Sequence, residues 1–240
     1  MKTEIELDGK VIEVDLITRK RKTIGIIVQI PSKVRVLAPV GLKKELIIQT
    51  VKSKGPWILQ KLEELEKRRL EIPRRDFVDG ETIPFLGEQY ELVIIPLKQS
   101  NKVNIRLEEN RFIVHTPNSS KEYLREALVA WYKSELHKVI RSRVAHFQKY
   151  FKDAPSEIVV KNQKAQWASC TSKRKLLFNW RLALAPLAVI EYVVVHEMSH
   201  MVHMNHSKEF WALVESILPD YKEHRKWLKE FSLTLSFDKF

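Results

Sequence analysis

Cysteine, glycine and long apolar runs are scarce in this sequence of 240 residues. The single cysteine, Cys170, excludes a disulfide within the chain, so a reducing cytoplasm is the expected setting. No apolar run approaches the roughly 18 residues of a membrane span. The first residues also lack the apolar core of a signal peptide, so no membrane association is expected. All six glycines lie between Gly9 and Gly87.

Composition predicts a globular protein, because 44% of the residues are hydrophobic and 30% are charged. The length suffices for one large domain or two small ones. The net charge of +12 is densest on residues 118–152, which hold eight basic and three acidic side chains. A basic surface favours acidic partners, nucleic acid included, although many basic proteins have none. Nothing in the sequence indicates an oligomeric state.

Residues 196–200 read H-E-x-x-H, a pattern typical of a metal site. His196 and His200 are four residues apart, so on a helix they lie on one face. Two imidazoles on one face can bind a zinc ion at roughly 2.0–2.1 Å. Glu197 lies beside them and can take a proton from water at the metal without being a ligand. The segment before them is apolar, which favours a buried helix over a chance match.

A catalytic zinc usually has three protein ligands and one open position. His206 follows His200 by six residues, the spacing of the third histidine in metzincins. The glycine of that motif is absent, and His203 stands in its place. We therefore expect a different turn, with Asn205 as its left-handed residue. The side chain of His203 is expected to face solvent or to cap the helix.

Residues 1–117 are predicted to form a strand-rich N-terminal region with helical segments. Alternating apolar residues on both sides of Gly9 are typical of a hairpin. A shift of 78 residues aligns Gly9 with Gly87 and Val14 with Leu92. This alignment suggests a faint internal duplication of a strand-rich unit followed by a helix.

Residues 118–240 are predicted to form a zincin-like metallopeptidase domain, so the fold class is α+β. Ser119-x-x-Glu122 is a capping-box pattern that opens a long helix ending near Phe151. Short strands follow, and an apolar helix begins at Pro186 and carries the histidines. A long backing helix, a small sheet and a metal-binding helix, in this order, are typical of a zincin.

The strand just upstream of the metal helix is the candidate for substrate binding. Residues 176–182 are expected to run beside the zinc as the outermost strand, where an extended peptide can pair with them. Asn179 suits a contact with a substrate amide, with Phe178 and Trp167 as further candidate contacts. The alternative is that Asn179 satisfies a buried backbone group.

Residues 161–230 resemble the YgjP-like family of zinc metallopeptidases, relatives of the SprT-like group, and the weaker N-terminal pattern also fits. The resemblance depends on these motifs: Lys164-Ala165-Gln166-Trp167-Ala168-Ser169-Cys170, Asn179-Trp180-Arg181-Leu182, Ala185-Pro186, Tyr192-Val193-Val194-Val195-His196-Glu197, Asn205-His206-Ser207, Phe210-Trp211 and Pro219-Asp220-Tyr221. It implies metal ligation by the three histidines and a general-base role for Glu197. Ala168 replaces a glycine usual in the family, and alanine would be strained there if φ were positive.

The expected function is zinc-dependent hydrolysis of peptide bonds in a peptide or protein substrate. No oxyanion donor is selected among Tyr192, Tyr221 and His203. One alternative is a nucleic-acid-associated protease acting on DNA-bound proteins, as SprT-like relatives do, with a basic track along residues 118–152. Another is a metal-dependent hydrolase of a non-peptide substrate. A purely structural metal module is disfavoured, because three ligands and a glutamate leave an open position.

Overall fold

The computed structural model describes residues 2–29, 33–71, 75–97, 102–163 and 166–231. The chain forms two compact units, Met1–Pro73 and Arg74–Phe240, and both combine helices with small sheets. The predicted α+β class is therefore confirmed. Within the described residues, no helix combines the length and the apolar character that crossing a membrane requires.

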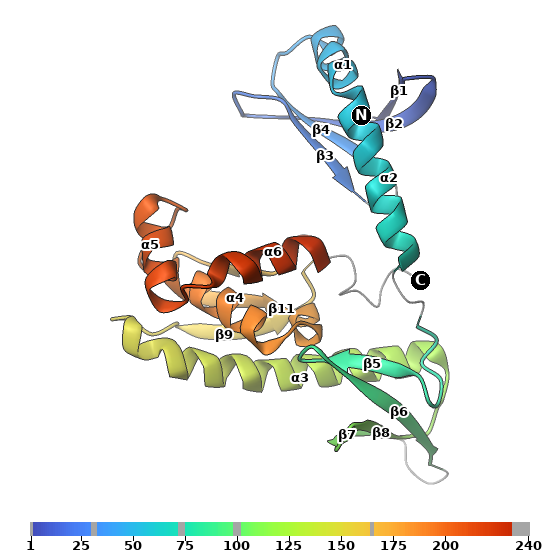
Figure 1. Cartoon of the computed structure of the whole chain (residues 1–240), viewed down its shortest axis with the longest axis vertical. Coiled ribbons are helices and arrows are strands. Elements are labelled where there is room, and N and C mark those ends of the chain that lie inside the picture. Colours follow the sequence, from blue (N-terminus) through green and yellow to red (C-terminus); the bar gives the residue numbers. More distant parts are fainter. Residues whose placement is uncertain (1, 30–32, 72–74, 98–101, 164–165, 232–240) are drawn as a thin grey trace. The chain divides into compact units, whose positions relative to one another are not determined.

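The first unit is a four-stranded sheet with two helices against it (Figure 1). The turn between the first two strands has left-handed residues, with φ of 46° at Asp8 and 77° at Gly9, as a two-residue hairpin requires. Strand order is β1-β2-β4-β3, and apolar residues of both helices share one core with the strands. The elements are β1 (Lys2–Leu7), β2 (Lys10–Arg19), β3 (Gly25–Gln29), β4 (Lys33–Pro39), α1 (Lys44–Ser53) and α2 (Gly55–Glu71).

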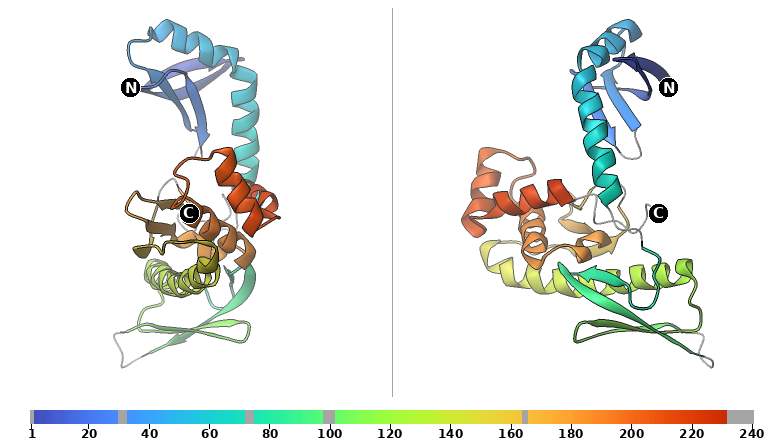
Figure 2. Two further views of the ribbon diagram at one scale, coloured as in Figure 1. Left: turned by 90° about the vertical axis from the view of Figure 1, so that its left-hand side faces the viewer. Right: turned by 45° about the vertical axis from the view of Figure 1, so that its right-hand side comes forward.

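The second unit is organised around the long helix α3 (Lys121–Phe147). Buried side chains recur on it at steps of three or four residues from Leu124 to Phe147. In Figures 1 and 2, α3 lies between a four-stranded sheet on one side and helix α4 (Leu187–Ser199) with a small three-stranded sheet on the other. The four-stranded sheet has the order β5-β6-β8-β7. Its strands are β5 (Thr82–Phe85), β6 (Glu88–Pro96), β7 (Asn104–Glu108) and β8 (Arg111–Thr116).

The small sheet has the strand order β10-β11-β9. Its middle strand β11 pairs antiparallel with β10 and parallel with β9. The remaining elements are the 3-10 helix η1 (Gln148–Tyr150), β9 (Glu157–Lys161), β10 (Ala168–Cys170), β11 (Lys175–Asn179), the 3-10 helix η2 (Trp180–Leu184), α4 (Leu187–Ser199), α5 (Lys208–Ile217) and α6 (Tyr221–Phe231).

The two four-stranded sheets repeat one another. They have equivalent strand orders, and their registers match at the predicted shift of 78 residues. Val14 pairs with Val34 in the first sheet, as Leu92 pairs with Phe112 in the second. This agreement supports the internal duplication, which stays a prediction about the origin of the chain.

The boundary between the units differs from the one expected after residue 117. Sheet β5–β8 belongs with α3, because both contribute to one apolar core. The ring centroids of Phe112 and Trp131 are 4.8 Å apart, and the Tyr132 hydroxyl donates to the carbonyl of Pro84 (2.7 Å). At the β5–β6 turn, the amide of Leu86 donates to the carbonyl of Ala183 (2.7 Å). The division therefore falls after residue 73.

Gly87, at the β5–β6 turn, lies close to Pro186 at the start of α4. It has a φ of 90°, and a Cβ placed on it would lie 2.9 Å from the Cα of Pro186. Gly9, at the equivalent turn of the first sheet, has a φ of 77° but nothing within 4 Å of its Cβ position. Both positions thus require a residue that tolerates positive φ. Only at Gly87 would a side chain also collide with a neighbouring residue.

We expect Gly87→Ala to destabilise its unit more than Gly9→Ala destabilises the other. Both changes incur about 1–2 kcal/mol for a left-handed alanine. Only Gly87→Ala adds about 1–3 kcal/mol for forcing a carbon against Pro186. The free energy of unfolding, measured by denaturant titration with circular dichroism, gives the comparison. Equal losses in the two variants would show that Pro186 moves aside without cost.

Candidate metal centre

Helix α4 is stabilised by burial more than by helix propensity. It begins after Pro186, whose fixed φ suits a helix start. Residues 193–195 are all valines, β-branched residues of modest helix propensity, yet each is at most 4% exposed. The amide of His200 bonds to the carbonyl of His196 (3.3 Å), so both histidines lie on the last helical turn. The buried part of α4 thus fixes where the two imidazoles point.

Three histidines converge at the end of α4. One ring nitrogen from each of His196, His200 and His206 can be chosen so that all lie within 4.8 Å of one another. The Nε2 atoms of His196 and His206 are 3.0 Å apart. Tetrahedral zinc with Zn–N bonds of the usual length separates its nitrogen ligands by roughly 3.3 Å. The three side chains therefore fit a shared metal ion.

The backbone of His203 fixes the tautomer of His200. Nδ1 of His200 lies 3.1 Å from the carbonyl oxygen of His203. A carbonyl only accepts, so Nδ1 must donate, and Nε2 keeps its lone pair for a metal. The side chain of His203 was expected to face solvent or to cap the helix, and in the structure it is half-buried. Its backbone carbonyl has a further role, as the partner of His200.

The electrostatic surroundings favour neutral imidazoles. Burial, followed by the charges of His200, His206 and Arg225, lowers the pKa of His196 to about 3. Burial also lowers the pKa of His200. Neutral imidazole is the form that binds a metal, so these side chains are in the ligating state at neutral pH.

His206 is positioned by the helix that follows it. Ser207 caps α5, and its hydroxyl oxygen accepts from the amide of Phe210 (3.4 Å). The buried ring of Phe210 lies with its centroid 4.6–4.9 Å from those of all three histidines. Trp211 stacks on His206 at 5.5 Å and 21°. These aromatic contacts hold the third imidazole against the other two.

The turn before His206 is not built as expected. Asn205 is not among the described residues with positive φ, so the prediction of a left-handed asparagine is wrong. Three successive backbone bonds tighten the end of α4 instead, among them the amide of His203 to the carbonyl of Ser199 (2.9 Å). The chain can therefore turn back without a glycine.

Glu197 lies buried between α4 and β10, with only 5% of its surface exposed. The backbone amide of Cys170 hydrogen-bonds to its carboxyl group, and the other oxygen, Oε2, has no partner among the described residues. Burial raises the pKa of Glu197 to about 8, an effect that the Cys170 amide partly opposes. A buried carboxylate with one free oxygen, next to three histidines, suits proton transfer.

The expected edge strand is a central strand. β11 lies between β10 and β9, so the prediction that it offers a free edge to substrate is wrong. Phe178 is fully buried in the core. Asn179 donates to the carbonyls of Gln163 (3.0 Å) and Gln166 (3.1 Å), which is the structural role weighed as its alternative. Neither side chain is accessible to a substrate in this arrangement.

The edge beside Glu197 belongs to β10. Trp167, which precedes it, is half-buried, and its carbonyl accepts from the amide of Asn179 (2.7 Å). Ala168 lies within β10 without positive φ, so the missing family glycine causes no strain there. Lys164 and Ala165 of the same motif lie outside the described residues. Three small residues before a turn were the only sequence signal for this strand.

Cys170 is half-buried. Burial, followed by the charge of Glu197, raises the pKa of its thiol to about 11. The thiol is therefore protonated at neutral pH and is a poor nucleophile.

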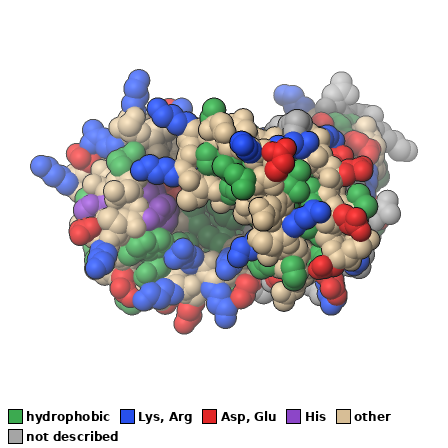
Figure 3. All heavy atoms as spheres, turned by 90° about the horizontal axis from the view of Figure 1, so that it is seen from above, with side chains coloured by type: hydrophobic (Ala, Val, Ile, Leu, Met, Phe, Trp, Pro, Cys, Tyr) green, Lys and Arg blue, Asp and Glu red, His purple; other side chains and the backbone are tan. Residues whose placement is uncertain are grey.

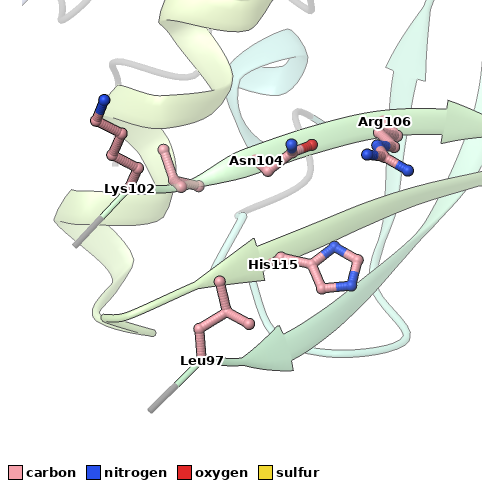
Figure 4. Close-up of a pocket in the computed structure, with 6 residues that line it drawn as sticks. Leu97, Lys102, Asn104, Arg106 and His115 are labelled. Carbon is pink, nitrogen blue, oxygen red and sulfur yellow. The ribbon is translucent and has the colours of Figure 1, made fainter. Parts of the chain in front are cut away.

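A separate hollow of about 480 Å³ lies on sheet β5–β8 (Figure 4). It contains a single histidine and no carboxylate, so it offers neither a metal site nor an acid–base pair. Its lining residues are Leu97, Lys102, Val103, Asn104, Arg106 and His115. The histidine cluster remains the candidate for chemistry.

A helix that brings two histidines and a buried glutamate to a third histidine defines a metal-dependent hydrolase site. The chain matches the model of the YgjP-like, metallopeptidase domain family over residues 22–231, and it belongs to this family of metal-dependent peptidases. The metallopeptidase zymogen of Pyrococcus abyssi abylysin is a similar solved structure, with 17% identity and a TM-score of 0.36. That match covers 39% of this chain and 95% of the other. A comparison with curated proteins gave no match.

Proposed function

We propose that this protein is a zinc peptidase in which His196, His200 and His206 bind the metal and Glu197 is the general base. The convergence of the three imidazoles beside a buried carboxylate carries this proposal. Three imidazole ligands suit zinc among the available divalent metals. The catalytic part is residues 118–240, in a zincin-like arrangement, with sheet β5–β8 supporting it. The reducing cytoplasm is the proposed setting.

Zinc bound there would polarise the scissile carbonyl and make the attacking water more acidic. The residues of the chain would transfer the protons and orient the reacting groups. The free Oε2 of Glu197 accepts the proton of the water and later gives it to the leaving amine. The amide of Cys170 holds the other carboxylate oxygen and so orients the side chain. Glu197 would therefore serve as general base in the first step and as general acid in the second.

The outer edge of β10 is the proposed binding line for the peptide. The amide of Thr171 donates to the carbonyl of Lys175 (3.0 Å), and at the other end of the ladder the amide of Asn179 donates to the carbonyl of Trp167 (2.7 Å). Antiparallel pairs alternate, so Ala168 and Cys170 direct their backbone groups away from β11. The outward amide of Cys170 is bonded to Glu197. The outward backbone groups of Ala168 are therefore the ones with which an extended peptide can pair.

Ala168→Pro should weaken peptide binding about three- to ten-fold, because it removes one outward amide donor. Ala168→Val is the matched control, since it changes the side chain and keeps the amide. Proline is tolerated on an edge strand when its nitrogen faces outward, so zinc content and circular dichroism should stay unchanged. Affinity is measured by fluorescence polarisation of a labelled peptide. Equal affinity of both variants would contradict pairing at Ala168.

The direct test of the proposed function is metal analysis combined with cleavage of a peptide library. We expect about one zinc per chain, loss of cleavage on chelation and recovery when zinc is restored. A different bound metal would refute the assignment of zinc. Full loading without cleavage of any peptide would favour the non-peptide hydrolase.

The nucleic-acid alternative gains no support from the arrangement of charge. Two cations of the expected basic track along residues 118–152 are paired with carboxylates: Lys138 with Glu135 (2.7 Å) and Arg143 with Glu191 (3.0 Å). Two cations beside the small sheet are paired likewise, Arg174 with Asp153 (2.9 Å) and Lys175 with Glu157 (2.7 Å). Figure 3 shows acidic side chains interspersed among the basic ones on the face in view. Paired cations have little charge left for phosphates.

A further inference from the structure

A stack of aromatic rings extends from the candidate metal ligand His206. The ring of Trp211 lies on His206, and Tyr221 lies on Trp211 with centroids 5.3 Å apart and planes 18° apart. Tyr192 of α4 continues the stack at 6.3 Å and 25°. These rings come from α4, α5 and α6, so the stack ties the metal centre to the first turn of α6.

Arg225 lies on this stack, one helical turn after Tyr221 on the same face of α6. Its guanidinium carbon is 4.8 Å from the centroid of the Trp211 ring. The side chain is exposed, and no carboxylate among the described residues pairs with it. Two neighbouring lysines differ, because Lys222 pairs with Glu215 (2.9 Å) and Lys226 with Glu230 (3.9 Å). Arg225 is thus a cation that lies over an aromatic ring and has no carboxylate partner among the described residues.

The charge of Arg225 reaches the metal centre. It is among the groups that lower the pKa of His196, after burial and the two other histidines. After burial, it is also the leading charge that acts on the pKa of Tyr192. A divalent cation bound by the three histidines would add positive charge here, and Glu197 is the acidic side chain next to these ligands. An unpaired arginine at this place attracts an anion.

A guanidinium that stacks on a ring keeps its N–H edges free. These N–H groups can bind a carboxylate through a bidentate hydrogen bond, and the contact with the ring limits the directions in which they point. A peptide lying at the metal centre offers two sources of carboxylate: an acidic side chain and a free C-terminus. Both present the same anion to Arg225.

We propose that Arg225, held on Trp211, is a carboxylate-binding subsite of this peptidase, which selects substrates with a carboxylate near the scissile bond. This inference rests on the proposed function. It adds a substrate class to the site that the histidines and Glu197 define.

The test compares acetylated alanine-based peptides that carry Glu or Gln at each position around the cleaved bond, each with a free or an amidated C-terminus. The zinc-loaded full chain should prefer the carboxylate at one position by roughly ten-fold in kcat/KM. Glu-for-Gln preference identifies a side-chain carboxylate, and free-for-amidated preference identifies the C-terminus. The preference should shrink as salt is raised.

Arg225→Gln should abolish the preference and leave cleavage of the neutral peptides within about two-fold. Lys226→Gln removes the same charge from the next residue, which pairs with Glu230, and it should keep the preference. Arg225→Glu should reverse it in favour of peptides with Lys at that position. Zinc content should be unchanged in all three variants.

Two outcomes would overturn the subsite: an unchanged preference in Arg225→Gln, or an equal loss on every peptide, which would indicate a general role in the reaction. Binding to the Glu197→Gln variant separates this inference from the proposed function. Tryptophan fluorescence should report tighter binding of the carboxylate peptide, and that difference should vanish in the double variant with Arg225→Gln. If binding follows Arg225 but the wild-type protein cleaves nothing, the subsite stands and the peptidase function fails.

Discussion

Glu197→Gln should lower kcat for peptide cleavage by about 10²–10⁴-fold, the usual contribution of a general base. Glutamine has the shape of glutamate and can still accept from the amide of Cys170, so the local packing should persist. It has no lone pair basic enough to take a proton from water. Zinc content should therefore stay at the wild-type level while turnover is lost.

Glu191→Gln is the matched control for this experiment. It makes the same chemical change on the same helix, at a residue that pairs with Arg143 (3.0 Å). Its kcat should stay within about two-fold of wild type. Retained turnover in Glu197→Gln with zinc bound would remove Glu197 from the reaction and leave the carboxylate with a structural role.

Local spacing was enough to predict that the three histidines come together, because a helix is a local structure. His196 and His200 had to share a face once residues 187–199 were helical, and the apolar run before them made that helix predictable. The position of His206 followed because Ser207 starts the next helix with a side-chain cap. The turn that contains Asn205 was less predictable, since several backbone geometries reverse a chain over the same length.

The order of strands was not predictable in the same way. An apolar run such as residues 175–179 indicates a buried strand, but it does not say which strands flank it. β11 became central because β9 pairs with it in parallel, from a segment more than ten residues upstream. The boundary after residue 117 failed for a related reason. The contact of Phe112 with Trp131 packs sheet β5–β8 against α3, so both belong to one unit. No change in composition along the sequence marks such packing.

The second large effect is expected at the third histidine. His206→Ala should weaken zinc binding by more than about a hundred-fold, since losing even a residue behind a ligand costs 10–100-fold. His206 contributes an imidazole whose Nε2 lies 3.0 Å from that of His196, and alanine leaves two nitrogens for the metal. The affinity is measured by competition with a chromogenic chelator at fixed pH.

His203→Ala is the control that the structure supplies, three residues away in the same turn. His200 uses only the backbone carbonyl of His203, and alanine keeps that carbonyl. The control should therefore bind zinc within a few-fold of wild type, with the Nδ1 bond of His200 intact. If His203→Ala instead lost as much affinity as His206→Ala, the imidazole of His203 would have to reach the metal. The ligand set would then have to be reassigned, because His206 alone could not account for the third bond.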